Sequence, residues 1–168
     1  MSEIDEEQIR KWGLAFSDLI STKLKLNITF KNFNGEEILY SEFIEKSGKS
    51  QWITLCEEKT NNQTFIIAID YFSILGCTNN FFAESALLDK NIPETLSFSE
   101  KFIANELSNE ILPAFSSNEL DIGFIRNEEE LSLVHPFHED ESITVYSYEW
   151  TIDNQPFGVL NICHSHVL

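Results

Sequence analysis

The chain has 168 residues, of which 28 are acidic and 11 are basic, so its formal net charge at pH 7 is −17. A charge of this sign repels phosphate backbones and anionic lipids, which argues against nucleic acid or a membrane surface as a partner. Hydrophobic residues make up 42% of the chain and include 14 phenylalanines, enough to bury the core of one ordinary domain.

The cysteines and the N-terminus indicate the compartment. Cys56, Cys77 and Cys163 are far apart and odd in number, so they suggest no disulfide framework and point to a reducing cytoplasm. Residues 2–7 are mostly charged and lack the apolar core of a signal peptide, and no apolar stretch is long enough to span a bilayer. We therefore expect a cytoplasmic protein with no membrane insertion.

The first part of the chain predicts a helix, a strand and a turn. Apolar residues among charges favour a helix over residues 6–21, and alternating apolar residues over 24–30 favour a strand. Asn34 and Gly35 then predict a turn, and residues 38–44 a short helix or an irregular edge.

The next segment predicts a hairpin that leads into a helix. Two apolar runs within residues 51–70 flank the polar residues 59–62. Asp70 is placed to cap a short helix that begins directly after it, because its carboxylate can accept a hydrogen bond from a free backbone N–H. Residues 83–96 include Pro93 and are of mixed polarity, which is typical of a connector.

After the connector, the same order of elements returns. Residues 97–115 predict an amphipathic helix with Ser97 or Ser99 as its N-cap. Residues 120–126 predict a strand, and residues 142–163 predict a second hairpin.

The two hairpins are similar in sequence as well as in position. NNQTFIIAID begins at Asn61 and DNQPFGVLNI begins at Asp153, and each has a polar turn, then Asn-Gln-x-Phe, then an apolar strand. Since each hairpin follows a helix and a strand, the chain divides into two related α-β-β-β halves. Such halves form an α/β domain in which a largely antiparallel central sheet is flanked by helices.

Five segments, in order, resemble the middle domain of the flagellar motor switch protein FliM, a member of the CheC-like superfamily. They are FSDLISTKLKLNITF from Phe16, YSEFI from Tyr40, FIIAIDYFSILGCTNNFF from Phe65, LSFSEKFIANEL from Leu96 and GVLNICHSHVL from Gly158. The resemblance covers about residues 9–168. It implies a CheC-like pseudo-twofold α-β-β-β repeat, preceded by a charged N-terminal segment at residues 1–8.

The resemblance implies a scaffold in the cytoplasmic ring of the flagellar motor, at the basal body. Members of this family stand side by side in the ring, bind FliG through a Gly-Gly-x-Gly loop, and continue into a SpoA-type domain that assembles with FliN. A short N-terminal peptide containing Glu-Ile-Asp captures phosphorylated CheY. FliG-like, FliN-like and CheY-like proteins, and further copies of this chain, are therefore the implied partners.

The sequence departs from this pattern at three places. The family's glycine loop is replaced here by Phe81, Phe82, Ala83, Glu84 and Ser85. Ala and Glu do not adopt the positive φ that Gly allows, so these five residues, with Phe102 on the following helix, are candidates for a different partner contact. The chain ends at Leu168, before any SpoA-type domain, which indicates a shortened chain or a divergent stand-alone relative. SEIDEE at residues 2–7 echoes the CheY-binding peptide without its apolar continuation, and a solvated helix start is preferred.

An enzymatic alternative rests on Glu106 and Asn109. Some CheC-like proteins are phosphatases of phosphorylated CheY and use Glu-x-x-Asn on a surface helix to engage the response regulator and orient the attacking water. A helical wheel places both residues opposite the expected buried stripe, which consists of Ile103, Leu107, Ile111 and Ala114. The family motif has Asp or Ser four residues before the glutamate, where this chain has Phe102, so a solvated helix face is preferred.

Cysteine and histidine side chains near the end of the chain suggest a metal site only superficially. They are His135, His138, Cys163, His164 and His166. Structural zinc requires four ligands with settled spacing, which this set lacks. We expect a core cysteine and surface histidines, with no metal and no cofactor.

The sequence therefore favours a non-enzymatic protein–protein interaction domain of a flagellar motor switch. The matched segments and the lack of a complete catalytic set favour this interpretation. The alternatives are a phosphatase of phosphorylated CheY and a component of a type III secretion sorting platform.

Overall fold

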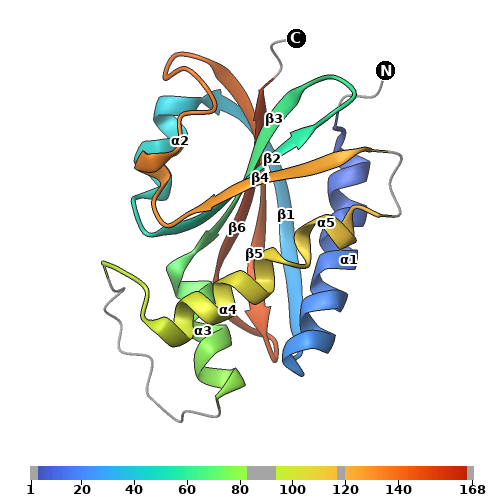
Figure 1. Ribbon diagram of the computed structural model, residues 1–168, viewed down its shortest axis with the longest axis vertical. Coiled ribbons are helices and arrows are strands. Elements are labelled where there is room, and N and C mark those ends of the chain that lie inside the picture. Colours follow the sequence, from blue (N-terminus) through green and yellow to red (C-terminus); the bar gives the residue numbers. More distant parts are fainter. Residues whose placement is uncertain (1–3, 83–93, 117–119, 166–168) are drawn as a thin grey trace.

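The computed structural model of this chain describes residues 4–82, 94–116 and 120–165, which form a central sheet with helices on both faces (Figure 1). The strands are β1 (Ile28–Leu39), β2 (Gln51–Glu58), β3 (Gln63–Asp70), β4 (Ile122–Glu128), β5 (Ser142–Ile152) and β6 (Gln155–Ser165). The helices are α1 (Glu6–Leu24), α2 (Tyr40–Ser47), α3 (Tyr71–Phe81), α4 (Phe98–Ser108), α5 (Ile111–Ala114) and the 3-10 turn η1 (Leu131–Leu133).

The described strands form a six-stranded antiparallel sheet in the order β1-β5-β6-β3-β2-β4. If β1, β2 and β3 are matched with β4, β5 and β6, this order reads the same from both ends, with a pseudo-twofold axis between β3 and β6. The outer strand of each half pairs with the hairpin of the other half, since β1 lies beside β5 and β4 beside β2. The predicted pseudo-twofold α-β-β-β repeat and its largely antiparallel sheet are thus confirmed.

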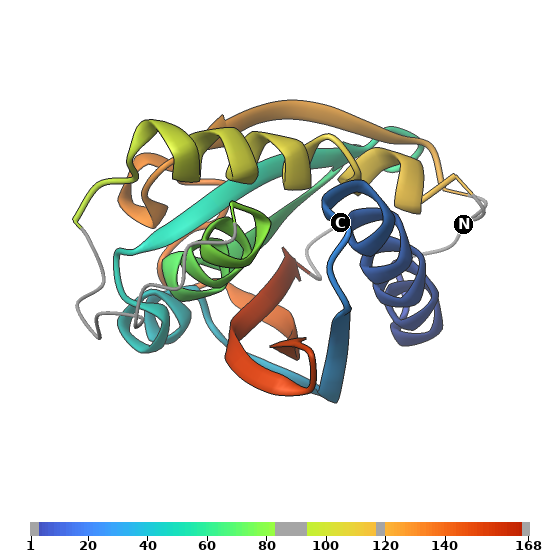
Figure 2. The same ribbon diagram turned by 90° about the horizontal axis from the view of Figure 1, so that it is seen from below.

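The two faces of the sheet are covered unequally. Side chains of α1, α3, α4 and α5 pack on one face and form the larger hydrophobic core. Figure 2 shows α5 beside α1 and α4 beside α3 on this face. The other face is covered by α2 and by the segment around η1, which contribute a smaller core. No helix within the described residues is long and apolar enough to cross a membrane.

Helix α1 extends further than the sequence predicts. Its buried stripe continues to Leu24, which is 3% exposed, so this residue completes the helix instead of starting a strand. Lys25 then ends the helix in the left-handed conformation, with φ 54°. Strand β1 begins at Ile28, whose backbone N–H and C=O both bond the Ser21 hydroxyl.

The predicted turn at Asn34 and Gly35 is wrong, because β1 continues through it. The long strand β5 pairs with β1 from Ile28 to Leu39, and this pairing outweighs the local turn signal. The irregularity is confined to a bulge between Lys31 and Asn34.

The predicted helix over 97–115 is two helices in the structure. Ser97 caps α4, which ends at Ser108, and α5 follows at Ile111. Pro113 explains the break, because a continuous helix would bring its ring against the carbonyl of Asn109. The predicted buried stripe is nevertheless confirmed, since all four of its residues are at most 1% exposed.

Both predicted hairpins are present, and so is the predicted cap at Asp70. The β2–β3 turn lies between Glu58 and Gln63. The β5–β6 turn has positive φ at Asp153 and Asn154, as a two-residue hairpin turn requires.

Candidate protein-binding site

Three phenylalanine rings form an exposed cluster where the end of α3 meets α4. The Phe81 ring lies 5.0 Å from the Phe82 ring and 6.4 Å from the Phe102 ring, measured between centroids. The exposed fractions of Phe81, Phe82 and Phe102 are 37%, 44% and 44%. We call these three residues the aromatic patch. The structure thus brings together the three described members of the predicted partner-binding set, whereas Ala83, Glu84 and Ser85 lie outside the described residues.

The position of the patch follows from how α3 and α4 are anchored. Asp70 accepts the backbone N–H of Ser73 at 2.9 Å and so fixes the start of α3. Ile74 and Cys77 of α3 and Ile103 of α4 are fully buried in the same core. These contacts hold the two helices together, and the patch rings occupy the adjoining positions that face outward.

Sequence reasoning missed Phe98, which is 89% exposed. It lies one helical turn before Phe102 on α4, so both rings avoid the stripe that carries Ile103 and Leu107. The signal that could have identified it is the spacing of four residues between Phe98 and Phe102, both of which lie outside the buried stripe of the helix. Exposed aromatic residues that gather in this way mark contact surfaces in soluble proteins.

Glu106 lies in an ion pair that the sequence did not predict. The Lys23 ammonium of α1 is 3.1 Å from the Glu106 carboxylate and 3.0 Å from the Glu110 carboxylate. Burial opposes the charge of Lys23, but the hydrogen bonds that its ammonium donates to Glu110 and Glu106 outweigh this and raise the pKa of the lysine. The carboxylate of Glu106 is therefore part of an ion pair that links α1 and α4.

Asn109 has different neighbours from Glu106. It ends α4 as the C-cap and is exposed. It also borders a hollow of about 240 Å³ between α4 and β4, together with Leu112, Phe124 and Asn127. The two residues of the suspected phosphatase motif thus lie three apart on one helix, with Glu106 bound to α1 and Asn109 beside β4.

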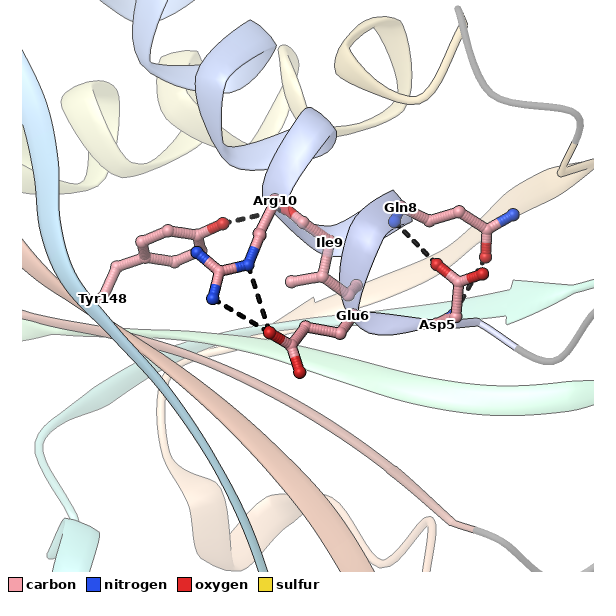
Figure 3. Close-up of polar contacts among 6 residues, drawn as sticks. All are labelled: Asp5, Glu6, Gln8, Ile9, Arg10 and Tyr148. Carbon is pink, nitrogen blue, oxygen red and sulfur yellow. Dashed lines mark hydrogen bonds and ion pairs between the residues drawn. The ribbon is translucent and has the colours of Figure 1, made fainter.

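The acidic N-terminal segment is part of the folded domain from Ile4 onward, and Ile4 is 2% exposed. Figure 3 shows Asp5 and Gln8 in a reciprocal capping box, in which each side chain accepts the backbone N–H of the other residue. In the same view Arg10 bonds Glu6 at 2.9 Å. The Ile-Asp pair that echoes the CheY-binding peptide therefore serves to start α1.

The start of α1 is also tied to the sheet. The Tyr148 hydroxyl of β5 donates to the carbonyl of Ile9 at 2.9 Å (Figure 3). The Arg10 guanidinium lies over the Phe33 ring, 4.1 Å from its centroid. Release of the start of α1 as far as Arg10 to capture a partner would break both contacts.

Known proteins resemble this chain in structure but not detectably in sequence. No protein-family profile matches the chain, and no curated protein matches it in sequence. The FliM middle domain of H. pylori superposes with a TM-score of 0.75 at 13% identity, over 96% of this chain and 93% of that one. The FliM middle domain of Vibrio alginolyticus gives 0.78 at 11% identity, over 95% and 91%. The chain has the fold of the FliM middle domain.

This FliM-type fold also resembles a chemotaxis protein, CheX, but less closely. The chemotaxis protein CheX of Vibrio vulnificus superposes with a TM-score of 0.53 at 10% identity, over 95% of this chain and 98% of that one. Coverage is similar in the three comparisons, so the lower score reflects larger deviations between the superposed backbones. The FliM fold expected from the five sequence segments is confirmed.

The cysteine side chains of this chain lie in its core and are not reactive groups. Cys56, Cys77 and Cys163 are free and buried. Burial raises the pKa of Cys56 and of Cys77 to about 12 and the pKa of Cys163 well above its usual value, so the thiols are protonated at neutral pH. No group of three or more potential metal ligands occurs among the described residues.

The expectation of surface histidines is wrong for His164. This residue lies on β6, is 2% exposed and stacks on the Tyr146 ring with centroids 5.8 Å apart. The strand continues through Cys163 to Ser165 because β3 and β5 pair with it on both sides. His135 and His138 are exposed, as expected, and His166 lies outside the described residues.

Proposed function

We propose that this domain is a FliM-like scaffold of a flagellar motor switch and that it binds a FliG-like protein through the aromatic patch. The single observation that carries the proposal is the exposed contact among Phe81, Phe82 and Phe102. The FliM-type fold supports it, and one solved relative with this fold, FliM of H. pylori, was crystallised in complex with FliG at 14% identity to this chain.

The chemistry of the patch suits a protein partner. Aromatic side chains supply large contact areas at low entropic cost and are enriched among the residues that dominate binding energy. A glycine loop binds through close approach of the backbone, which Ala83 and Glu84 do not favour. The rings of Phe81 and Phe82 offer a side-chain contact in its place.

The proposed role is non-enzymatic. A phosphatase of the CheC type needs a carboxylate that is free to engage the response regulator, and the Glu106 carboxylate is bound to Lys23. The buried thiols are protonated and offer no nucleophile. Binding and positioning of partners is the remaining role that these side chains support.

The proposal includes the proteins that would lie next to this domain in a switch ring at the basal body. Side-by-side association of copies and a FliN-like neighbour follow from a FliM-like position. CheY capture by residues 2–7 is not included, because Ile4 and Asp5 already serve the helix start. Crosslinking in cells followed by mass spectrometry would identify these neighbours, and a secretion apparatus would yield a different set.

The direct test is binding to the FliG-like protein encoded in the same genome. We expect the double variant Phe81→Ser, Phe102→Ser to bind at least tenfold more weakly than the wild type, because both rings lose their contact area. Leu133→Ser is the matched control, since Leu133 is 54% exposed and lies on η1. Equal binding by the double variant and the wild type would remove the patch from the interface.

A further inference from the structure

Strand β4 forms one edge of the sheet, and no described strand pairs with its outer side. Two large apolar side chains follow one another on it, Phe124 at 49% and Ile125 at 42% exposure. An apolar sheet edge of this kind offers unpaired backbone groups to another chain. No residue of β4 belongs to the aromatic patch, so this edge is independent of the proposed switch function.

The hydrogen bonds between β2 and β4 show which backbone groups of β4 face outward. The N–H of Lys59 donates to the C=O of Asp121 at 2.8 Å, so these two facing residues form a hydrogen-bonded pair. Facing residues of an antiparallel pair alternate between bonded and non-bonded pairs, and the pairs that Ile122 and Phe124 form with β2 are therefore non-bonded. The N–H and C=O groups of Ile122 and Phe124 thus point toward the open edge.

The hollow of about 240 Å³ between α4 and β4 lies beside these outward groups. Its surface is mainly apolar and includes the side chains of Leu112 and Phe124. Two amides also line it: Asn127 accepts the Thr54 hydroxyl at 2.8 Å through Oδ1, which leaves its Nδ2 donors unused, and the Asn109 amide bonds no described residue. The hollow therefore offers apolar contact together with polar groups that can bond a peptide backbone.

A strand added to β4 would use the edge and the hollow together. Its side chains would alternate between the two faces of the sheet, so the one that faces α4 beside Phe124 would enter the hollow. A bulge at Ile125 interrupts the pairing of β4 with β2, which limits the regular edge to the first residues of the strand. The added strand is therefore short.

The charges around β4 decide between the possible occupants. Carboxylates outnumber cations along this edge, and each cation is already paired with one of the carboxylates. The carboxylates belong to Glu57, Asp121, Glu128, Glu129 and Glu130, and the cations to Lys59, Lys101 and Arg126. A second copy of this chain would bring a further net charge of −17, which opposes the pairing of two identical edges. A basic segment would be attracted instead.

We propose that β4 binds an extended basic segment of a partner protein, which adds to the sheet as a further strand and places one apolar side chain in the hollow. Backbone hydrogen bonds to Ile122 and Phe124 supply affinity, and the hollow selects the apolar side chain. Lysine or arginine residues that alternate with this side chain match the excess of carboxylates.

The probe is the end-blocked peptide Lys-Thr-Lys-Leu-Lys-Thr-Lys, titrated into the whole chain and followed by amide chemical shifts in NMR. We expect saturable shifts that are largest at Ile122, Phe124 and Asn127. Phe124→Ser removes a wall of the hollow and should weaken binding at least tenfold. Leu39→Ser is the matched control, because Leu39 is 40% exposed at the end of β1, the strand at the opposite edge, and should leave the affinity within twofold.

Two changes in the peptide test the backbone pairing and the charge without altering the protein. The N–H groups of alternate residues in a strand point to opposite edges, so N-methylation of one alternate set should abolish binding and N-methylation of the other set should not. A peptide with glutamate in place of every lysine should not bind.

Three results would overturn the proposal: equal effects of the two N-methylated sets, equal affinities of wild type and folded Phe124→Ser, or shifts that do not saturate. Association of two copies through β4 without peptide binding would also overturn it and make the edge an interface between copies. The double variant Phe81→Ser, Phe102→Ser should bind the peptide as the wild type does. Failure at β4 is thereby distinguished from failure of the FliG-like contact at the aromatic patch.

Discussion

The carboxylate of Asp70 accepts a hydrogen bond from the backbone N–H of Val159 at a distance of 2.9 Å. Asp70 ends β3 and caps α3, whereas Val159 lies on β6 in the other half of the repeat. One side chain thus fixes the start of α3, which ends at Phe81 of the aromatic patch, and joins the two halves at their pseudo-twofold axis.

This arrangement predicts a strict requirement for glycine at position 158. A Cβ there would lie 2.2 Å from Asp70 Oδ1 and 2.4 Å from Ser73 Oγ. We expect Gly158→Ala to lower the free energy of unfolding by about 1–3 kcal/mol, measured by urea denaturation. Gly123→Ala is the control, because its Cβ would come closer than ordinary van der Waals contact only to the end of the flexible Lys59 side chain, at 2.8 Å from Cε. A loss at position 123 as large as that at 158 would contradict this explanation.

Glu58 predicts a specific acid dependence of stability. Its carboxylate closes the β2–β3 turn by accepting the backbone N–H groups of Thr60 at 3.0 Å and Asn61 at 2.7 Å. Burial opposes the charge, but the hydrogen bonds from Asn61 and Thr60 outweigh it and lower the pKa of Glu58 below its usual 4.5. A lowered folded pKa gives stability that is present above the unfolded pKa and is lost as the pH falls through the folded value.

The expected result is a smaller pH response in Glu58→Gln than in the wild type. The variant should be less stable at neutral pH, and the difference should shrink as the pH falls below about 4.5. Urea denaturation from pH 7 downward measures this difference, with Glu45→Gln on the exposed side of α2 as a control that should follow the wild type. If the stability difference between Glu58→Gln and the wild type were the same at every pH, the Glu58 side chain would stabilise the turn through its packing and not through its charge.

Lys23 predicts an energetic coupling between α1 and the helices α4 and α5. Its side chain is 28% exposed, and its ammonium bridges Glu106 and Glu110. Replacement of Lys23 by Met leaves two carboxylates near each other, so we expect a loss of about 1 kcal/mol, which is modest because the groups are partly solvated. A double-mutant cycle of Lys23→Met with Glu110→Gln measures the coupling, and additive effects of the two changes would contradict it.

Local patterns predicted much of this fold. Each hairpin has its turn residues beside its apolar runs, and Asp70 and Ser97 stand directly before the helices that they cap. The repeat was visible because the two hairpins share a sequence pattern. The aromatic patch was predicted in part, because Phe102 interrupts the polar face of an otherwise amphipathic helix.

The exchange of outer strands between the halves could not be predicted in the same way. Local residues at Asn34 and Gly35 favour a turn, and only pairing with the distant strand β5 keeps β1 extended. The Lys23–Glu106 contact likewise depends on how α1 packs beside α4 and α5. Both features arise from tertiary contacts, which override local preferences without leaving a periodic pattern in the sequence.

The last prediction concerns catalysis by the suspected phosphatase pair. We expect the domain to leave the decay of a phosphorylated CheY-like response regulator within twofold of its intrinsic rate, because the Glu106 carboxylate is held by Lys23. The decay of radiolabelled phosphoprotein with and without the domain measures this. Lys23→Met removes the partner of the Glu106 carboxylate. It serves as the control that tests whether this ion pair is what keeps the decay rate unchanged. Acceleration by the wild type that disappears in both Glu106→Ala and Asn109→Ala would establish an enzyme, because a scaffold has no reason to depend on these two groups for dephosphorylation.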